Sequence, residues 1–250
     1  MATIVLVPGA GLGGWAWSRV TPLLEREGHA VHPVTLTGLG AADRDDDAAA
    51  IDLSTHVADL VALLEGADLH EVVLVGHSLS GLAISGAAAR VPERIARLVF
   101  LDATLPVSGL SAFAAAGPEF EQAIVAAAEA GGDPRRVPWF DDETLDLYYP
   151  GNEISAEDRA WIRRESAGHP LAVLREPREI AETTLPRTYV TCLRRMGPSP
   201  VGDETPGWEH ATLDAGHWPM VTRPRATAAL LGEIATRAAA STPARGGQAR

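Results

Sequence analysis

The chain of 250 residues is long enough for one α/β domain, and its composition, 46% hydrophobic and 22% charged, excludes a disordered or fibrous protein. A net charge of −12 argues against nucleic acid and anionic membrane as partners. All 21 basic residues are arginine, which excludes lysine chemistry, and the single cysteine, Cys192, excludes an internal disulfide and a cysteine-based zinc site. We therefore expect chemistry based on hydroxyls, imidazoles and carboxylates, with no metal and no organic cofactor.

The first predicted element is an apolar strand over residues 3–7, followed by the glycine-rich loop Pro8-Gly9-Ala10-Gly11-Leu12-Gly13-Gly14. No basic segment precedes the strand, and no apolar run approaches the roughly 18 residues of a membrane span, so a cytoplasmic location is expected. The loop leaves backbone N–H groups uncovered and can supply one half of an oxyanion hole. Dinucleotide binding is the alternative, but the glycines do not fit G-x-G-x-x-G and no acidic residue closes the next strand.

Helices and strands then alternate as far as residue 101. We predict helices over residues 15–27, 55–65 and 79–90, and strands over residues 30–34, 71–75 and 97–101. Strands that alternate with helices form parallel sheets covered on both faces. The first hundred residues therefore predict a doubly wound α/β core.

The third strand leads directly into Gly76-His77-Ser78-Leu79-Ser80-Gly81. A strand, a sharp turn of small residues and a helix are the context in which G-x-S-x-G forms a nucleophile elbow. Ser78 lies at the tip of the turn, where its hydroxyl is exposed, and the amide of Leu79 opens the next helix. One position departs from the motif, because Ser80 stands where glycine is usual.

Residues 103–185 interrupt the alternation and are mostly helical, with helices predicted over 111–130, 142–149 and 155–167. The segment contains seven of the thirteen aromatic residues. A helical insertion of this kind is commonly a lid above the carboxyl ends of the strands. We predict a core of residues 1–102 and 186–238, a lid of residues 103–185 and a flexible tail of residues 239–250. Gly9, Trp139, Tyr148 and Trp218 are predicted pocket residues, although the lid aromatics can equally pack a core of the lid.

Two strands over residues 188–193 and 209–213 and a helix over residues 224–238 complete the predicted elements. The loop after the last strand is Asp214-Ala215-Gly216-His217-Trp218. A histidine here agrees with the chain order serine, acid, histidine of one class of hydrolases. An imidazole can accept a serine proton near neutral pH and return it to a leaving group, so His217 is the predicted general base.

The segments VLVPGAGLGGWAW, TLTGLG, IDLSTHVADL, VVLVGHSLSG and AGHWPM together resemble the α/β-hydrolase superfamily. The branch with the greatest similarity contains plant hydroxynitrile lyases, plant methylesterases and small bacterial esterases. The resemblance implies an α/β-hydrolase fold with a mostly parallel sheet of about six strands. It also implies Ser78 as nucleophile, His217 as base and the amides of Ala10 and Leu79 as oxyanion donors.

Two positions depart from the family pattern and bear on the reaction. Pro8 stands where the family usually has histidine. Lyase activity in the plant enzymes depends on a lysine directly after the catalytic histidine, and this chain has Trp218 there. The resemblance therefore favours ester hydrolysis over cyanohydrin cleavage.

The acid of a catalytic triad is absent from its usual place. The family has it three residues after position 192, where this chain has Arg195. Three alternatives stay open: Asp102 at the end of the fourth strand, Asp203 or Glu204 on a long loop, or a Ser–His dyad without an acid. Arg194 and Arg195 are either surface residues or a binding site for an anionic substrate group.

The sequence thus predicts a serine hydrolase for a small or medium apolar carboxylic ester, with Ser78, His217 and Asp102 as catalytic residues. We expect a small-molecule substrate and a monomer or homodimer. Two other hypotheses remain. The scaffold is diverted to a cyclisation, elimination or C–C cleavage of a natural product, or the protein binds a small ligand without catalysis.

Overall fold

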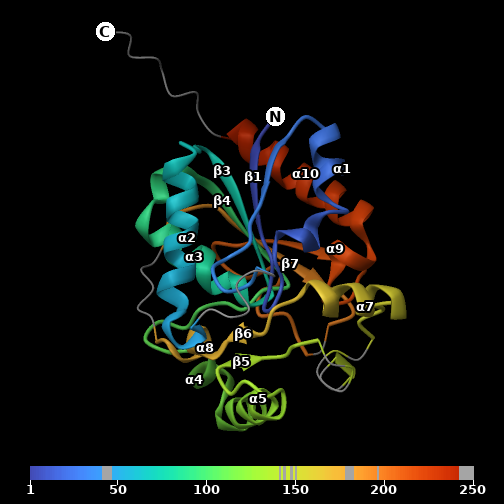
Figure 1. Ribbon diagram of the computed structural model, residues 1–250. Coiled ribbons are helices and arrows are strands. Elements are labelled where there is room, and N and C mark those ends of the chain that lie inside the picture. The colour runs from blue at the N-terminus through green and yellow to red at the C-terminus, as the bar shows by residue number, and fades with distance from the viewer. Residues whose placement is uncertain are drawn as a thin grey trace.

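The computed structural model describes residues 1–40, 47–140, 142, 145–146, 149, 151–177, 183–195 and 197–241. A six-stranded sheet with the order β2-β1-β3-β4-β7-β8 forms its centre (Figure 1). All five strand pairs are parallel, which confirms the predicted sheet. The strands are β1 (Thr3–Val7), β2 (Ala30–Pro33), β3 (Val72–His77), β4 (Ile95–Leu101), β7 (Arg187–Cys192) and β8 (Glu209–Leu213).

Helices cover both faces of the sheet (Figure 1). Because side chains alternate along a strand, Ile4 and Leu6 of β1 belong to one buried cluster, whereas Val5 and Val7 belong to the other. The first cluster includes residues of α1 (Thr21–Arg26), α9 (Pro219–Thr222) and α10 (Pro224–Ser241), and the second includes residues of α2 (Leu53–Gly66) and α3 (Gly81–Arg90). Short 3-10 helices are η1 (Gly14–Trp17), η3 (Ala48–Ala50), η4 (Ser78–Ser80) and η5 (Pro92–Arg94).

Most predicted elements of the core differ from the observed ones by one to three residues at an end or are divided in two, and two of these differences have a clear local cause. The helix predicted over residues 15–27 is divided into η1 and α1, because Pro22 lies in the first turn of α1, where its missing N–H is tolerated. The strand predicted over residues 71–75 begins one residue later, since Glu71 has a φ of 52° and cannot join the ladder. Strand β3 also ends two residues later than predicted, at His77, directly before Ser78.

The segment between β4 and β7 lies at the carboxyl ends of the strands (Figure 1). Its buried residues Phe113, Ile124 and Ile162 join the cluster on the α1 and α10 side of the sheet. The helix predicted over residues 111–130 is broken at Gly117, whose φ is 99° and which Pro118 follows. The elements are α4 (Ala112–Ala116), α5 (Pro118–Ala130), β5 (Arg136–Val137), α7 (Ala156–Glu165), β6 (His169–Pro170) and α8 (Leu171–Arg175).

Two predictions fall partly outside the described residues: the helix over residues 142–149 and the tail over residues 239–250. Within the described ranges, no helix has the length and apolar character needed to cross a membrane.

Candidate active site

The turn after β3 holds Ser78 in a conformation that few non-glycine residues adopt. Its φ is 53°, and the left-handed region destabilises such a residue by about 1–2 kcal/mol. The amide of Thr104 donates to the Ser78 carbonyl at 2.9 Å, and a Cβ on Gly76 would lie 2.9 Å from the Ser80 carbonyl oxygen. The Ser80 hydroxyl donates to the carbonyl of Pro8. The serine at this motif position therefore ties the turn to the loop after β1.

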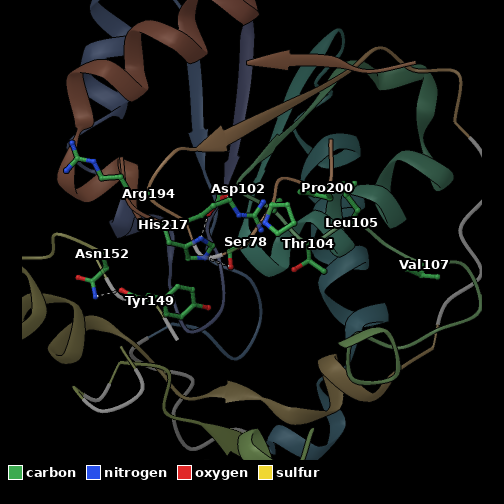
Figure 2. Close-up of a pocket in the computed structure, with 13 residues that line it drawn as sticks. Ser78, Asp102, Thr104, Leu105, Val107, Tyr149, Asn152, Arg194, Pro200 and His217 are labelled. Atoms are coloured by element: carbon green, nitrogen blue, oxygen red, sulfur yellow. Dashed lines mark hydrogen bonds and ion pairs between the residues drawn. The ribbon is translucent and has the colours of Figure 1, made fainter. Parts of the chain in front are cut away.

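His217 follows β8 and lies between Ser78 and Asp102 (Figure 2). Its Nε2 is 2.9 Å from Ser78 Oγ, and its Nδ1 is 2.6 Å from Asp102 Oδ2. An ionised carboxylate only accepts hydrogen bonds, so Nδ1 donates to Asp102 and Nε2 is left to accept the serine hydroxyl. The structure thus brings together the serine, the histidine and one of the three candidate carboxylates.

A cation lies against the other oxygen of Asp102. Arg195 Nε is 3.3 Å from Asp102 Oδ1, and the Asp102 side chain is only 1% exposed. Arg195 Nη1 donates to the hydroxyl of Tyr189 at 3.3 Å. Burial raises the pKa of Asp102, but the hydrogen bond from His217 and the charges of His217 and Arg195 together bring that pKa below its ordinary value. Asp102 is therefore an ionised bridge between an imidazole and a guanidinium.

Asp203 lies elsewhere, which contradicts its assignment as the partner of His217. Its Oδ1 is 2.7 Å from His210 Nδ1 and its side chain is exposed. Among the described residues, Asp102 is the carboxylate within hydrogen-bond distance of His217. The alternative of a site with no acid beside the histidine is also contradicted. The physical reason is the strand order, because β4, which Asp102 follows, lies next to β3 in the sheet.

The loop after β1 lies against the turn that holds Ser78. A Cβ on Gly9 would come within 2.8 Å of the Cβ of Ser78, so only glycine permits this approach. The amide of Ala10, the next residue, makes no hydrogen bond with any described residue. Leu79 is the second residue of η4, and its amide precedes the first hydrogen-bonded turn. Both predicted oxyanion donors are therefore available to a ligand.

A cavity of about 510 Å³ opens over Ser78 and His217 (Figure 2). Arg194 lies at its edge and pairs with Asp214 at 2.9 Å and with Glu153. The lining comes from the turn at Ser78, from the segments that follow β4, β7 and β8, and from the insertion. It consists of Ser78, Asp102, Ala103, Thr104, Leu105, Val107, Tyr149, Asn152, Arg194, Arg195, Pro198, Pro200 and His217.

The predicted pocket residues that the structure describes, Gly9, Trp139 and Trp218, are absent from this lining. Gly9 packs beside Ser78, and Trp139 is 7% exposed within the core. Trp218 is buried because its ring packs edge-on against Tyr149, with centroids 4.6 Å apart. Tyr148 lies outside the described residues.

Tyr149 and the segment after β4 line the cavity but were not predicted as site residues. The Tyr149 ring stacks on His217, with centroids 4.8 Å apart and planes 20° apart. Its one signal was its place in the aromatic-rich insertion. Thr104, Leu105 and Val107 had a clearer signal, since they directly follow the strand after the nucleophile helix, and ligands bind at such carboxyl ends.

A family model described as "Alpha/beta hydrolase family" matches residues 4–230. The chain belongs to the alpha/beta hydrolase family. A "Carbendazim hydrolyzing esterase" from Nocardioides sp. is 30% identical to it over 94% of this chain and 100% of that protein. Salicylic acid-binding protein 2 from Nicotiana tabacum is 39% identical, over 42% of this chain and 40% of the tobacco protein.

An extracellular alpha/beta-hydrolase from a Paenibacillus species has a similar structure, with a TM-score of 0.81. The match covers 94% of this chain and 99% of that chain at 22% sequence identity, so it supports the fold alone. Among the residues that the structure describes, this alpha/beta hydrolase has no cluster of three or more histidine, cysteine, aspartate or glutamate side chains placed to hold a metal ion.

Proposed function

We propose that this alpha/beta hydrolase is a serine esterase for small or medium, largely apolar carboxylic esters. The observation that carries the proposal is the hydrogen-bonded chain from Asp102 through His217 to Ser78 at a cavity of about 510 Å³. A relative that matches over its full length is named an esterase. That name supports ester hydrolysis as the reaction of this chain.

The acylation step uses the tautomer that the site imposes. Ser78 Oγ attacks the ester carbonyl carbon while its proton passes to His217 Nε2, 2.9 Å away. The C=O bond opens to an oxyanion that the amides of Ala10 and Leu79 bind. The intermediate then collapses, the C–O bond to the alcohol breaks, and His217 returns the proton to the alkoxide that leaves.

Deacylation repeats these steps with water. His217 accepts a proton from water, the hydroxide oxygen attacks the acyl carbon, and the Ser78 oxygen leaves with the proton from His217. Asp102 stabilises the imidazolium in both halves of the reaction. Because Arg195 is ion-paired with that carboxylate, the charge balance of this site differs from a triad whose acid has no cationic partner.

The lining favours an apolar acyl or alcohol group near the serine. Leu105, Val107, Pro198 and Pro200 provide hydrocarbon surface in the lining of the cavity. Apolar walls with a few convergent polar groups are typical of small-molecule sites.

We also propose that residues 103–185 form a lid on a core of residues 1–102 and 186–238. Tyr149 and Asn152 of this segment line the cavity, which supports a role in holding the substrate. The cytoplasmic location and the monomeric or dimeric state stay predictions; size-exclusion chromatography with light scattering measures the oligomeric state.

The test of the function is Ser78→Ala with p-nitrophenyl butyrate and a fluorophosphonate probe. Turnover is expected to disappear, and mass spectrometry of the wild-type protein should find the phosphonyl adduct on Ser78. Ser85→Ala is the matched control, because Ser85 lies on α3 and its hydroxyl donates to the Gly81 carbonyl within the helix. Unchanged turnover in Ser78→Ala contradicts the mechanism. A protein that binds the ester without turnover favours the ligand-binding hypothesis.

A further inference from the structure

Two buried histidines hold the loop after β1 on either side of Ala10. The amide of Gly9 donates to His77 Nδ1 at 3.2 Å, and the amide of Gly11 donates to His169 Nδ1 at 3.2 Å. His77 and His169 are 0% and 2% exposed. The Ala10 amide lies between two amides that are already bonded, and it alone of the three stays available.

The first histidine belongs to the nucleophile strand. His77 ends β3, and its Nε2 lies 2.7 Å from the carbonyl oxygen of His217. A carbonyl accepts, so Nε2 carries the proton and Nδ1 accepts from Gly9. Burial lowers the pKa of His77 to about 3, which keeps the ring neutral. His77 therefore links the glycine loop to the backbone of His217.

The second histidine comes from the insertion, far away in sequence. His169 lies on β6, and burial lowers its pKa well below the ordinary value, so it is neutral. Because Nδ1 accepts from Gly11, the proton lies on Nε2, which is buried with no hydrogen-bond partner among the described residues. An unpaired buried donor destabilises a fold. The fold nevertheless holds His169 in this tautomer, the one in which Nδ1 can accept the hydrogen bond from the Gly11 amide.

The insertion also packs closely against the loop after β1 at Gly11. Gly11 has a φ of 70°, and a Cβ there would lie 3.0 Å from Phe140 Cε2 and 3.1 Å from the Ala167 carbonyl oxygen. Glycine is conformationally free, so a loop with glycines at both sides of Ala10 does not orient its own peptide planes. The two imidazoles fix the plane before and the plane after the Gly9–Ala10 peptide.

We propose that His169, together with His77, is a positioning residue that aims the Ala10 amide at the oxyanion of the tetrahedral intermediate. The proposal rests on the proposed esterase function. It assigns to the insertion a part in transition-state stabilisation as well as in enclosing the substrate.

The test compares two substitutions that differ in where they place an acceptor. In His169→Asn the side-chain oxygen can take the place of Nδ1 and accept the hydrogen bond from the Gly11 amide. In His169→Gln the side-chain oxygen takes the place of Nε2 instead, so this hydrogen bond is lost. Loss of one oxyanion donor lowers kcat by about 10²–10³, so a misaligned donor in His169→Gln is expected to lower kcat by about 10- to 100-fold. KM should change little, and His169→Asn should stay within about threefold of wild type. His169→Leu also lacks the acceptor, so it decides the question if His169→Gln does not fold.

A second measurement separates alignment from general damage. A trifluoromethyl ketone adds to the serine and forms an oxyanion, whereas the corresponding secondary alcohol does not. The ketone should bind His169→Gln more weakly by the factor lost in kcat, with unchanged affinity for the alcohol. His56→Leu is the control. The centroids of the His56 and His169 rings are 5.6 Å apart, but His56 Nε2 donates to the Thr37 carbonyl and not to the loop after β1. It should lower Tm and leave kcat intact.

Wild-type kcat and ketone affinity in His169→Gln or His169→Leu overturn the inference, and so does an equal loss in His169→Asn. Failure of the esterase function is a separate result. In that case Ser78→Ala keeps its turnover and the wild-type protein forms no adduct with the ketone.

Discussion

The ion pair between Arg195 and Asp102 has a measurable consequence for the pH dependence of catalysis. His217 must be neutral to accept the serine proton, and it becomes positively charged in the transition state. Arg195, whose side chain is only 23% exposed, places a permanent positive charge on the other side of the same carboxylate. Removal of that charge by Arg195→Met is expected to move the acidic limb of kcat/KM to higher pH, because a guanidinium opposes a second positive charge at the same carboxylate.

The size of the shift follows from the separation of the two cations across Asp102. Two hydrogen-bond lengths and a carboxylate separate them by roughly 7 Å, at which unit charges interact by about 0.6 kcal/mol at a dielectric constant of 80 and about 2.4 kcal/mol at 20. Since about 1.4 kcal/mol corresponds to one pH unit, the limb should move by about 0.4 to 1.7 units. Because the same charge opposes the imidazolium of the transition state, the rate on the alkaline plateau should rise rather than fall.

The assay is kcat/KM for a neutral p-nitrophenyl ester between pH 4 and pH 9 at fixed ionic strength. Arg194→Met is the matched control. It removes the neighbouring guanidinium, which pairs with Asp214 and Glu153 rather than with Asp102. A limb that stays in place or moves to lower pH in Arg195→Met refutes the electrostatic reasoning. A rise in KM confined to esters with a carboxylate group assigns Arg195 to substrate binding instead.

Two further predictions concern the acid and the glycine loop. Asp102→Asn should lower kcat by about 10⁴, as for the buried aspartate of serine proteases, whereas Asp203→Asn should change it less than about twofold because Asp203 contacts His210; steady-state kinetics of both variants would expose a reversed assignment. Gly11→Ala places a side chain at a φ of 70°, which is expected to destabilise the fold by about 1–2 kcal/mol and lower Tm by about 2–8 °C. Calorimetry measures this change, and an unaltered Tm would contradict the strain argued at Gly11.

The strands and the serine turn could be predicted because their signals are local. Strands β1 and β8 have the predicted limits, since short apolar runs bounded by turn residues fix both ends. The break at Gly117-Pro118, which divides the helix predicted over residues 111–130, was not predicted. Local patterns therefore predicted most of the helices and strands but not all of their ends.

The sequence favoured Asp102 as the carboxylate beside His217 but left two alternatives open, because the choice depends on which strands are neighbours. The contact of His169 with Gly11 joins residues 158 positions apart. A single histidine in a mostly helical segment has no pattern that indicates such a partner. Tyr149 was missed for the same reason, since stacking on His217 depends on how the insertion packs on the strand ends.

The arrangement of β4 and β7 leads to a final prediction about the two possible positions of the acid. The strands are parallel neighbours, Leu101 pairs with Val190, and the Asp102 amide donates to the Val190 carbonyl at 2.8 Å. The segments that follow them therefore meet at one place, where Arg195 occupies the usual acid position and contacts Asp102. A carboxylate on either segment should therefore be able to orient His217.

Three variants with Asp102→Asn test this equivalence. Alone, the substitution leaves Arg195 beside a neutral amide, and kcat should be lowest because the unpaired guanidinium opposes the imidazolium. Adding Arg195→Met removes the cation and should recover part of the rate. Adding Arg195→Asp removes the cation and supplies a carboxylate, and should exceed the methionine variant by at least about tenfold, a small part of the roughly 10⁴ that a triad acid contributes. Equal rates for the aspartate and methionine variants would show that a carboxylate after β7 does not reach His217 in this chain. Strand order alone would then not explain why the acid follows β4.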